Sequence, residues 1–180
     1  MRRLVDQARL KQFMRALARE VRTPARVYLT GGASAVLLEW RATTIDVDLE
    51  IRPESDQLLR AIPKLKEDLE INVELASPGH FIPELPGWEE RSPLIAREGV
   101  LSFHHYDFYA QALAKIERGH ARDVADVREM HARRLIDPAR LMDFFAAIES
   151  QLYRYPAIDP RSFRQAVDRM RFELSAGGRT

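Results

Sequence analysis

Residues 26–51, RVYLTGGASAVLLEWRATTIDVDLEI, contain the pattern that decides the fold of this chain. The pattern predicts a strand over Arg26–Thr30, a glycine turn, a short helix over Ala33–Trp40 and a second strand. In the second strand apolar and acidic residues alternate, so the acids share one face. These acids are Asp46, Asp48 and Glu50. Like charges on one face repel each other unless something neutralises them.

The turn between the first strand and the short helix contains two glycines, Gly31 and Gly32. Glycine permits a backbone turn that a side chain would obstruct, and the helix that follows begins with amide groups that have no partner inside it. These amides and the positive helix end favour an anion such as phosphate, to which Ser34 can add a hydrogen bond. Most such turns merely join a strand to a helix, so the turn alone does not establish a phosphate site.

The acidic strand supports a metal site more directly. Asp46 and Asp48 are two residues apart on one face, and Mg²⁺ characteristically uses one or two carboxylates together with substrate phosphates. The alternative is a half-exposed strand with a solvated acidic edge. Because the glycine turn stands one short helix upstream, we favour the metal site, and we assign Glu50 to solvent.

A third strand is predicted over Ile71–Ala76, where apolar and polar residues alternate again. Its polar face contains Asn72 and Glu74. Glu74 is the best-placed third acid for a site built on Asp46 and Asp48, and a solvated strand acid is the alternative.

The glycine pair, Ser34, the short helix and Asp46-Val47-Asp48 together resemble the signature of the nucleotidyltransferase superfamily, the polymerase-beta-like fold. The later segment KIERGHARDVAD, Lys115–Asp126, resembles the lysine-and-aspartate motif of the small bacterial abortive-infection-type (AbiEii-like) nucleotidyltransferases. Proteins of that branch often serve as toxins of toxin–antitoxin pairs. Beyond residue 126 the chain resembles the family only as a helical tail.

The resemblance implies transfer of a nucleoside monophosphate from an NTP, such as ATP, to an acceptor hydroxyl, with release of pyrophosphate. It implies that Asp46 and Asp48 hold two Mg²⁺ ions during catalysis. It also implies that Glu74 binds the metal nearer the acceptor and helps to deprotonate the attacking hydroxyl.

The resemblance further assigns residues to the nucleotide. The expected grip on the β- and γ-phosphates comes from Gly31, Gly32 and Ser34. Lys115 is expected to reach toward the triphosphate and to offset charge on the pyrophosphate, with Asp123 or Asp126 orienting Lys115 or Arg118. The alternative is that these are helix-end charges facing solvent.

Composition limits the remaining possibilities. The chain has 180 residues and a formal charge of +1, from 28 basic and 27 acidic residues, so no global field draws it to nucleic acid or to an acidic membrane. It has no cysteine, and its five histidines are scattered, which argues against disulfides and a zinc site. No run of 18 apolar residues occurs, so we expect a soluble, cytoplasmic protein that does not bind membranes.

We expect an α/β fold: a small mixed β-sheet nucleotidyltransferase core flanked by helices, followed by a helical C-terminal portion. The core is expected over residues 1–105, with a hairpin of Leu94–Arg97 and Val100–His105. The helical portion is expected over residues 106–174, packed on the core, and a disordered tail over residues 175–180. The acidic residues Asp107, Asp137 and Asp159 mark helix starts.

The acceptor is not determined by these patterns. RNA, including tRNA ends, or a protein is expected from the resemblance, and an antitoxin protein is a further expected partner. Two alternatives stand beside this hypothesis. One is a catalytically inactive module of the same fold that binds or regulates a partner. The other is a small-molecule, aminoglycoside-type nucleotidyltransferase, whose acidic pocket Glu84, Glu89 and Glu90 could line.

Overall fold

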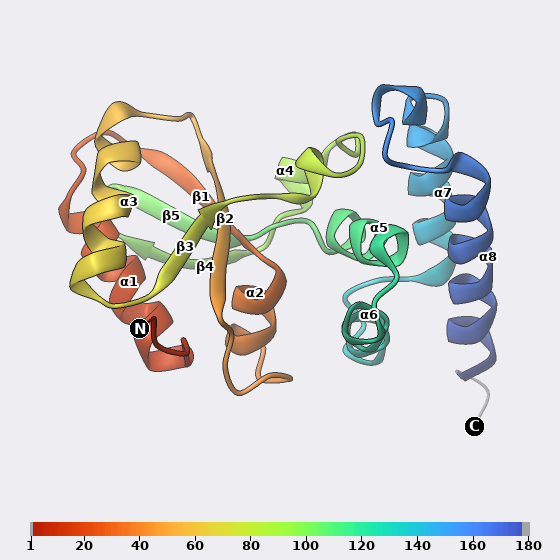
Figure 1. Ribbon diagram of the computed structural model, residues 1–180, viewed down its shortest axis with the longest axis horizontal. Coiled ribbons are helices and arrows are strands. Elements are labelled where there is room, and N and C mark those ends of the chain that lie inside the picture. The colour runs from red at the N-terminus through yellow and green to blue at the C-terminus, as the bar shows by residue number, and fades with distance from the viewer. Residues whose placement is uncertain (1, 178–180) are drawn as a thin grey trace. The chain divides into compact units, whose positions relative to one another are not determined.

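The computed structural model describes residues 2–177, and its elements follow the expected order (Figure 1). The strands are β1 (Ala25–Thr30), β2 (Asp46–Arg52), β3 (Asn72–Leu75), β4 (Leu94–Glu98) and β5 (Leu101–His105). The helices are α1 (Gln7–Arg19), α2 (Gly31–Leu37), α3 (Asp56–Asp68), α4 (Trp88–Arg91), α5 (Phe108–Arg118), α6 (Ala121–Ala132), α7 (Pro138–Glu149) and α8 (Pro160–Gly177). The predicted α/β class, with a mixed sheet flanked by helices, is confirmed.

The chain forms two compact units. The sheet unit comprises the described residues up to Ser77 together with Ser92–Tyr106, and the helical unit comprises Pro78–Arg91 and the described residues from Asp107 onward. A boundary was expected after residue 105, and the sheet unit ends at Tyr106. Residues 78–91, which were expected in the core, group with the helices. Helix α8 includes Ser175–Gly177, and the rest of the expected tail, residues 178–180, lies outside the described residues.

The five strands are ordered β3-β2-β1-β5-β4, so β1 is the central strand. It pairs antiparallel with β2 and parallel with β5. Strand β3 runs parallel to β2, and β4 and β5 form the predicted antiparallel hairpin. In this register Thr30 stands opposite Asp48, so the end of β1 and the glycine turn after it lie beside the acidic part of β2.

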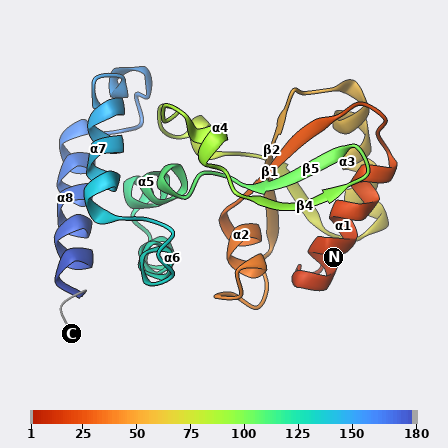
Figure 2. The same ribbon diagram turned by 180° about the vertical axis from the view of Figure 1, so that it is seen from behind.

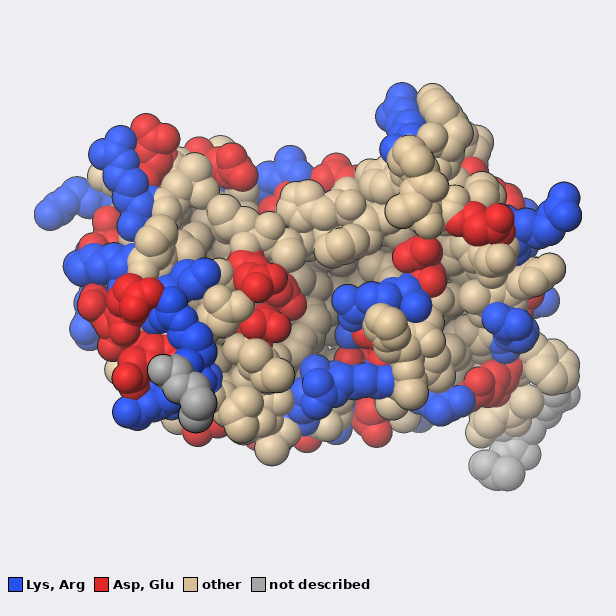
Figure 3. All heavy atoms as spheres, in the orientation of Figure 1, with Lys and Arg blue, Asp and Glu red and all other residues tan. Residues whose placement is uncertain are grey.

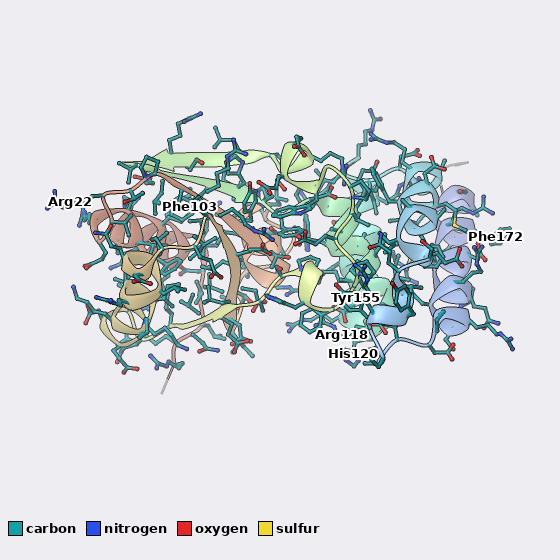
Figure 4. The ribbon with its side chains drawn as sticks, turned by 90° about the horizontal axis from the view of Figure 1, so that it is seen from above. Arg22, Phe103, Arg118, His120, Tyr155 and Phe172 are labelled. Carbon is teal, nitrogen blue, oxygen red and sulfur yellow. The ribbon has the colours of Figure 1, made fainter. Side chains whose placement is uncertain are left out.

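One face of the sheet is apolar and is covered by α1 and α3, which contact each other (Figures 1 and 2). Every second residue of β2 is buried in this core, beginning with Val47. Phe103 of β5, labelled in Figure 4, is fully buried there. Successive residues of a strand point to opposite faces, so the acids of β2, which alternate with these buried residues, lie on the opposite, polar face.

The caps of the helices agree with their sequence signals. The side chain of Asp6 accepts a hydrogen bond from the Arg9 amide at the start of α1, and Ser55 does the same for Leu58 in α3. Pro63 lies inside α3, where a proline removes one backbone hydrogen bond and tends to bend a helix. The structure instead keeps α3 as one helix from Asp56 to Asp68.

In the helical unit, α7 and α8 lie side by side (Figures 1 and 2). The rings of Phe145 in α7 and Phe163 in α8 pack edge to face, with centroids 4.9 Å apart. Helix α5 begins at the cap Asp107 and ends at Gly119, which adopts a positive φ of 70°. This left-handed glycine closes the helix.

Basic and acidic side chains are interspersed on the face shown in Figure 3, in agreement with the balanced net charge. Within residues 2–177, no helix combines the length and the apolar character needed to cross a bilayer.

Candidate active site

The predicted acids of β2 and β3 share the polar face of the sheet. Asp48 is paired directly with Glu74 of β3, and Asp46 with Asn72, so these four side chains point to the same side. Asp46 and Asp48 are half-buried, whereas Glu74 is exposed. The alternation that predicted this face is therefore reproduced in the structure.

The Asp48 carboxylate lies against the glycine turn. A Cβ atom built on Gly31 would lie 3.1 Å from Asp48 Oδ2, and Gly31 has a positive φ of 58°. Both observations favour glycine at this position, because a larger residue would be strained and would press on the carboxylate. The turn is thus shaped around Asp48.

Gly32 is required for a different reason. It is the second residue of α2, which begins two residues earlier than predicted, and a Cβ atom there would lie 2.0 Å from Thr44 Oγ1 and 2.7 Å from Thr44 Cβ. The Thr44 hydroxyl in turn donates a hydrogen bond of 3.1 Å to the backbone oxygen of Asp46. Close packing of α2 on Thr44 thereby fixes the start of the acidic strand.

We expect Gly32→Ala to lower the free energy of unfolding by about 2 kcal/mol, because the added methyl group must displace Thr44. Urea unfolding measures this change. The matched control is Gly177→Ala, where no atom lies within 4 Å of the added Cβ. In the double variant with Thr44→Gly, the two losses are expected to sum to less than their separate values, by at least about 1 kcal/mol. Strict additivity would contradict the packing argument.

Asn72 bridges two of the acids, a role that sequence analysis missed. Its amide nitrogen donates to Asp46 Oδ1 at 2.7 Å and to Glu74 Oε1 at 2.9 Å. Ionised carboxylates only accept hydrogen bonds, so the amide must turn its NH₂ group toward both. The alternation of Ile71–Ala76 already placed Asn72 beside Glu74, but the pairing with Asp46 depends on strand register.

Ser34, which was predicted to bind phosphate, lies inside the sheet unit. The residue is fully buried, and its hydroxyl donates to the Leu29 backbone oxygen at 3.1 Å. Ser34 Oγ also lies 2.9 Å from His105 Nδ1. The hydroxyl therefore joins β1, α2 and β5 inside the sheet unit.

His105 is buried with Ser34 and is shielded from solvent. Burial, reinforced by the charge of His104, lowers the pKa of His105 to about 4. The imidazole is consequently neutral at physiological pH. With the Ser34 hydroxyl donating to Leu29, the Nδ1–H group of His105 is the donor in the Ser34–His105 bond.

Lys115 and Asp126 meet in the helical unit. Lys115 Nζ lies 2.7 Å from Asp126 Oδ2 and 3.4 Å from Asp123 Oδ1, and all three residues are buried. Arg118, labelled next to His120 in Figure 4, holds both oxygens of Asp123, at 2.7 Å and 2.5 Å. Burial raises the pKa of the Asp123 carboxyl, but the hydrogen bonds and charges of Arg118 and Lys115 outweigh it and hold that pKa below its usual range.

The acids of the sheet unit offer hard oxygen donors of the kind that Mg²⁺ prefers. Within the described residues, no three His, Asp or Glu side chains gather into a metal-holding group. A magnesium site completed by substrate phosphates needs only one or two carboxylates, so the donor set of Asp46 and Asp48 fits this cation. Glu74 is linked to Asp46 through the Asn72 amide, which donates to both carboxylates.

Comparison with protein families gives one match. A family described as "Nucleotidyltransferase of unknown function (DUF6036)" matches residues 7–173. This range includes the glycine turn, the acidic strand and the Lys115 segment. No curated protein and no solved structure matches the chain.

Proposed function

Because the chain belongs to the DUF6036 family of nucleotidyltransferases, we propose that it transfers a nucleoside monophosphate from an NTP to an acceptor hydroxyl. One observation supports this proposal most strongly. The Asp48 carboxylate lies 3.1 Å from the Cβ position of Gly31, at the start of α2. A carboxylate, the kind of ligand that Mg²⁺ uses, thus stands beside backbone amides that can contact phosphate.

In the proposed reaction the acceptor oxygen attacks the α-phosphorus of the NTP. The bond between that phosphorus and the bridging oxygen of the β-phosphate breaks, and its electron pair leaves with pyrophosphate. The acceptor proton passes to a base, for which exposed Glu74, beside Asp48 in the sheet, is our candidate. Such a reaction depends on positioning and charge neutralisation rather than on a protein nucleophile.

Asp46 and Asp48 are the residues that would hold Mg²⁺. When bound, the cation supplies charge stabilisation for the attacking and leaving oxygens. Asn72 orients the carboxylates of Asp46 and Glu74, and Thr44 fixes the backbone at Asp46. In this proposal the phosphates contact the amides of Gly31 and Gly32, without the buried hydroxyl of Ser34.

The role of Lys115 stays a prediction, because its described ion pairs are with Asp126 and Asp123. The toxin role and the antitoxin partner rest on the resemblance alone and are likewise predictions. For the acceptor we favour RNA over protein.

The proposed reaction is tested by incubating the purified protein with each α-³²P-labelled NTP, Mg²⁺ and total cellular RNA. The control is the variant Asp46→Asn with Asp48→Asn, which keeps the size of both side chains and removes their charge. We expect label on RNA with the wild type and none with the control. Omission of Mg²⁺ is expected to abolish the label as well.

The other outcomes separate the alternatives. Label on protein alone would make protein the acceptor. Equal labelling by the wild type and the Asp→Asn variant would contradict the assignment of the two aspartates. NTP binding without transfer to any acceptor would favour the inactive binding module, and label on an added aminoglycoside would favour the small-molecule enzyme.

A further inference from the structure

Three arginines and a serine form one row across four neighbouring strands, which we call the arginine row. Arg52 of β2 is paired with Arg26 of β1, Arg26 with Ser102 of β5, and Ser102 with Arg97 of β4. Residues paired in this way lie side by side and point to the same face. That face also contains Asp48, because Asp48 and Arg52 are four residues apart on β2.

The arginine row opens into a pocket of about 290 Å³. All four of its residues line this pocket, together with Pro53 and Gly99. The pocket lies where β1 begins, whereas the glycine turn follows the other end of β1. It is therefore separate from the candidate active site, although both belong to the sheet unit.

The charge of the pocket is positive. Arg26 and Arg97 are exposed, and the Arg52 side chain is 43% exposed. Among the described residues, Glu50 forms an ion pair of 2.5 Å with Arg52, and the side chain of Arg97 forms no ion pair or hydrogen bond. Among the described residues that line the pocket, three are arginines and none is acidic, so the lining carries a net positive charge. Guanidinium forks match the oxygens of phosphate, which they bind through two parallel hydrogen bonds.

The position of the pocket points to the acceptor rather than to the NTP. Arg52 is four residue steps after Asp48 on β2, which corresponds to about 13 Å along the strand. Under the proposed function the NTP phosphates stay at Asp46 and Asp48. A phosphate in the pocket then belongs to a second molecule. A polynucleotide brings phosphates at regular intervals along its length. One of its backbone phosphates can therefore lie in the pocket while its acceptor hydroxyl lies next to the NTP.

We propose that the arginine row binds a backbone phosphate of a single-stranded RNA acceptor. This inference rests on the proposed function for the choice of RNA, but binding itself requires neither NTP nor transfer. Arg26 and Arg97 contact the phosphate, and Arg52 is shared between it and Glu50.

The test is a fluorescence-anisotropy titration of the full chain with a labelled single-stranded RNA, at several salt concentrations, without NTP or Mg²⁺. The variants are Arg26→Gln, Arg97→Gln and their combination. Arg15→Gln is the matched control, because Arg15 is an exposed arginine on α1, which covers the apolar side of the sheet. Thermal melting verifies that each variant is folded.

Each pocket variant is expected to make the plot of log affinity against log salt shallower by about 0.7 and to weaken binding roughly fourfold at about 0.15 M salt. The combined variant is expected to weaken binding roughly fifteenfold. Arg15→Gln leaves the slope unchanged, and Arg97→Lys, which keeps the charge, retains the wild-type slope.

Equal RNA binding by Arg97→Gln, Arg26→Gln and the Arg15→Gln control would overturn the inference. Loss of ATP or inorganic phosphate binding in Arg97→Gln, with RNA binding unchanged, would also overturn it and assign the pocket to a free anion. Weakened RNA binding without any transfer by the wild type would contradict the proposed reaction and support this inference. Transfer to RNA by the wild type, with unaltered RNA binding in the arginine variants, would support the proposed reaction and contradict this inference.

Discussion

Replacement of Lys115 by methionine is expected to lower the free energy of unfolding by about 3–5 kcal/mol. Lys115 Nζ lies 2.7 Å from Asp126 Oδ2, and both side chains are at least nine-tenths buried. Methionine fills a similar volume but provides no charge, so the Asp126 carboxylate keeps its desolvation cost and loses its nearest cation. Urea unfolding at neutral pH measures the change.

The second variant in this experiment is Lys115→Met combined with Asp126→Leu. Because both charges are then absent, its stability is expected to approach that of the wild type. Arg118→Met serves as a comparison and is expected to cost less, since the Arg118 side chain is 54% exposed. A stability of Lys115→Met within about 0.5 kcal/mol of the wild type would contradict the importance of this ion pair.

The same pair of variants separates structure from catalysis at Lys115. If the double variant is stable and still transfers nucleotide, the lysine supports the helical unit only. If it is stable and inactive, the contact with the triphosphate that the resemblance implies gains support.

Acidification from pH 6.5 to pH 4 is expected to cost the protein about 3 kcal/mol of stability through His105. The folded pKa of His105 is about 4, because burial and the charge of His104 disfavour its protonated form. An unfolded histidine titrates near pH 6.5, so between these values the unfolded state binds the additional proton. The contribution of His105 is therefore fully present above pH 6.5 and is lost as the pH falls toward 4.

His105→Asn tests this expectation. Asparagine can still donate to Ser34 but does not titrate, so the difference in unfolding free energy between pH 7 and pH 4 is expected to shrink by about 3 kcal/mol relative to the wild type. His120→Gln is the control, because His120 is exposed at the start of α6 and forms no side-chain cap. A pH profile of His105→Asn parallel to that of the wild type would show that the buried imidazole is not the responsible group.

The acidic face could be predicted because strand alternation is a local property of the sequence. Asp46 and Asp48 share a face in any strand, whatever it pairs with. Asn72 escaped prediction because its hydrogen bond to Asp46 spans 26 residues and depends on the register of β2 and β3. The hydrogen bond of Ser34 could not be predicted for the same reason, because its partner His105 is 71 residues away in the sequence.

Local sequence patterns also did not predict that residues 78–91 belong to the helical unit. This proline-rich segment follows a strand and precedes a hairpin, so its sequence neighbours suggested the core. Its contacts are instead with the helices: Arg91 pairs with Asp107 at 2.7 Å, and the Tyr155 hydroxyl donates to the Gly79 oxygen at 3.1 Å. Periodicity does not reveal such long-range partners.

The order of the strands has a consequence for synthesis on the ribosome. Strand β1 is central in the finished sheet, but its partner β5 is encoded after the excursion through residues 78–91. Until residue 105 has emerged, the nascent chain can pair β1 only with β2, and its other side is an open edge with apolar residues such as Val27 and Leu29. Open edges of this kind recruit foreign strands. During translation the sheet unit therefore keeps this open edge until β5, which ends at His105, can pair with β1.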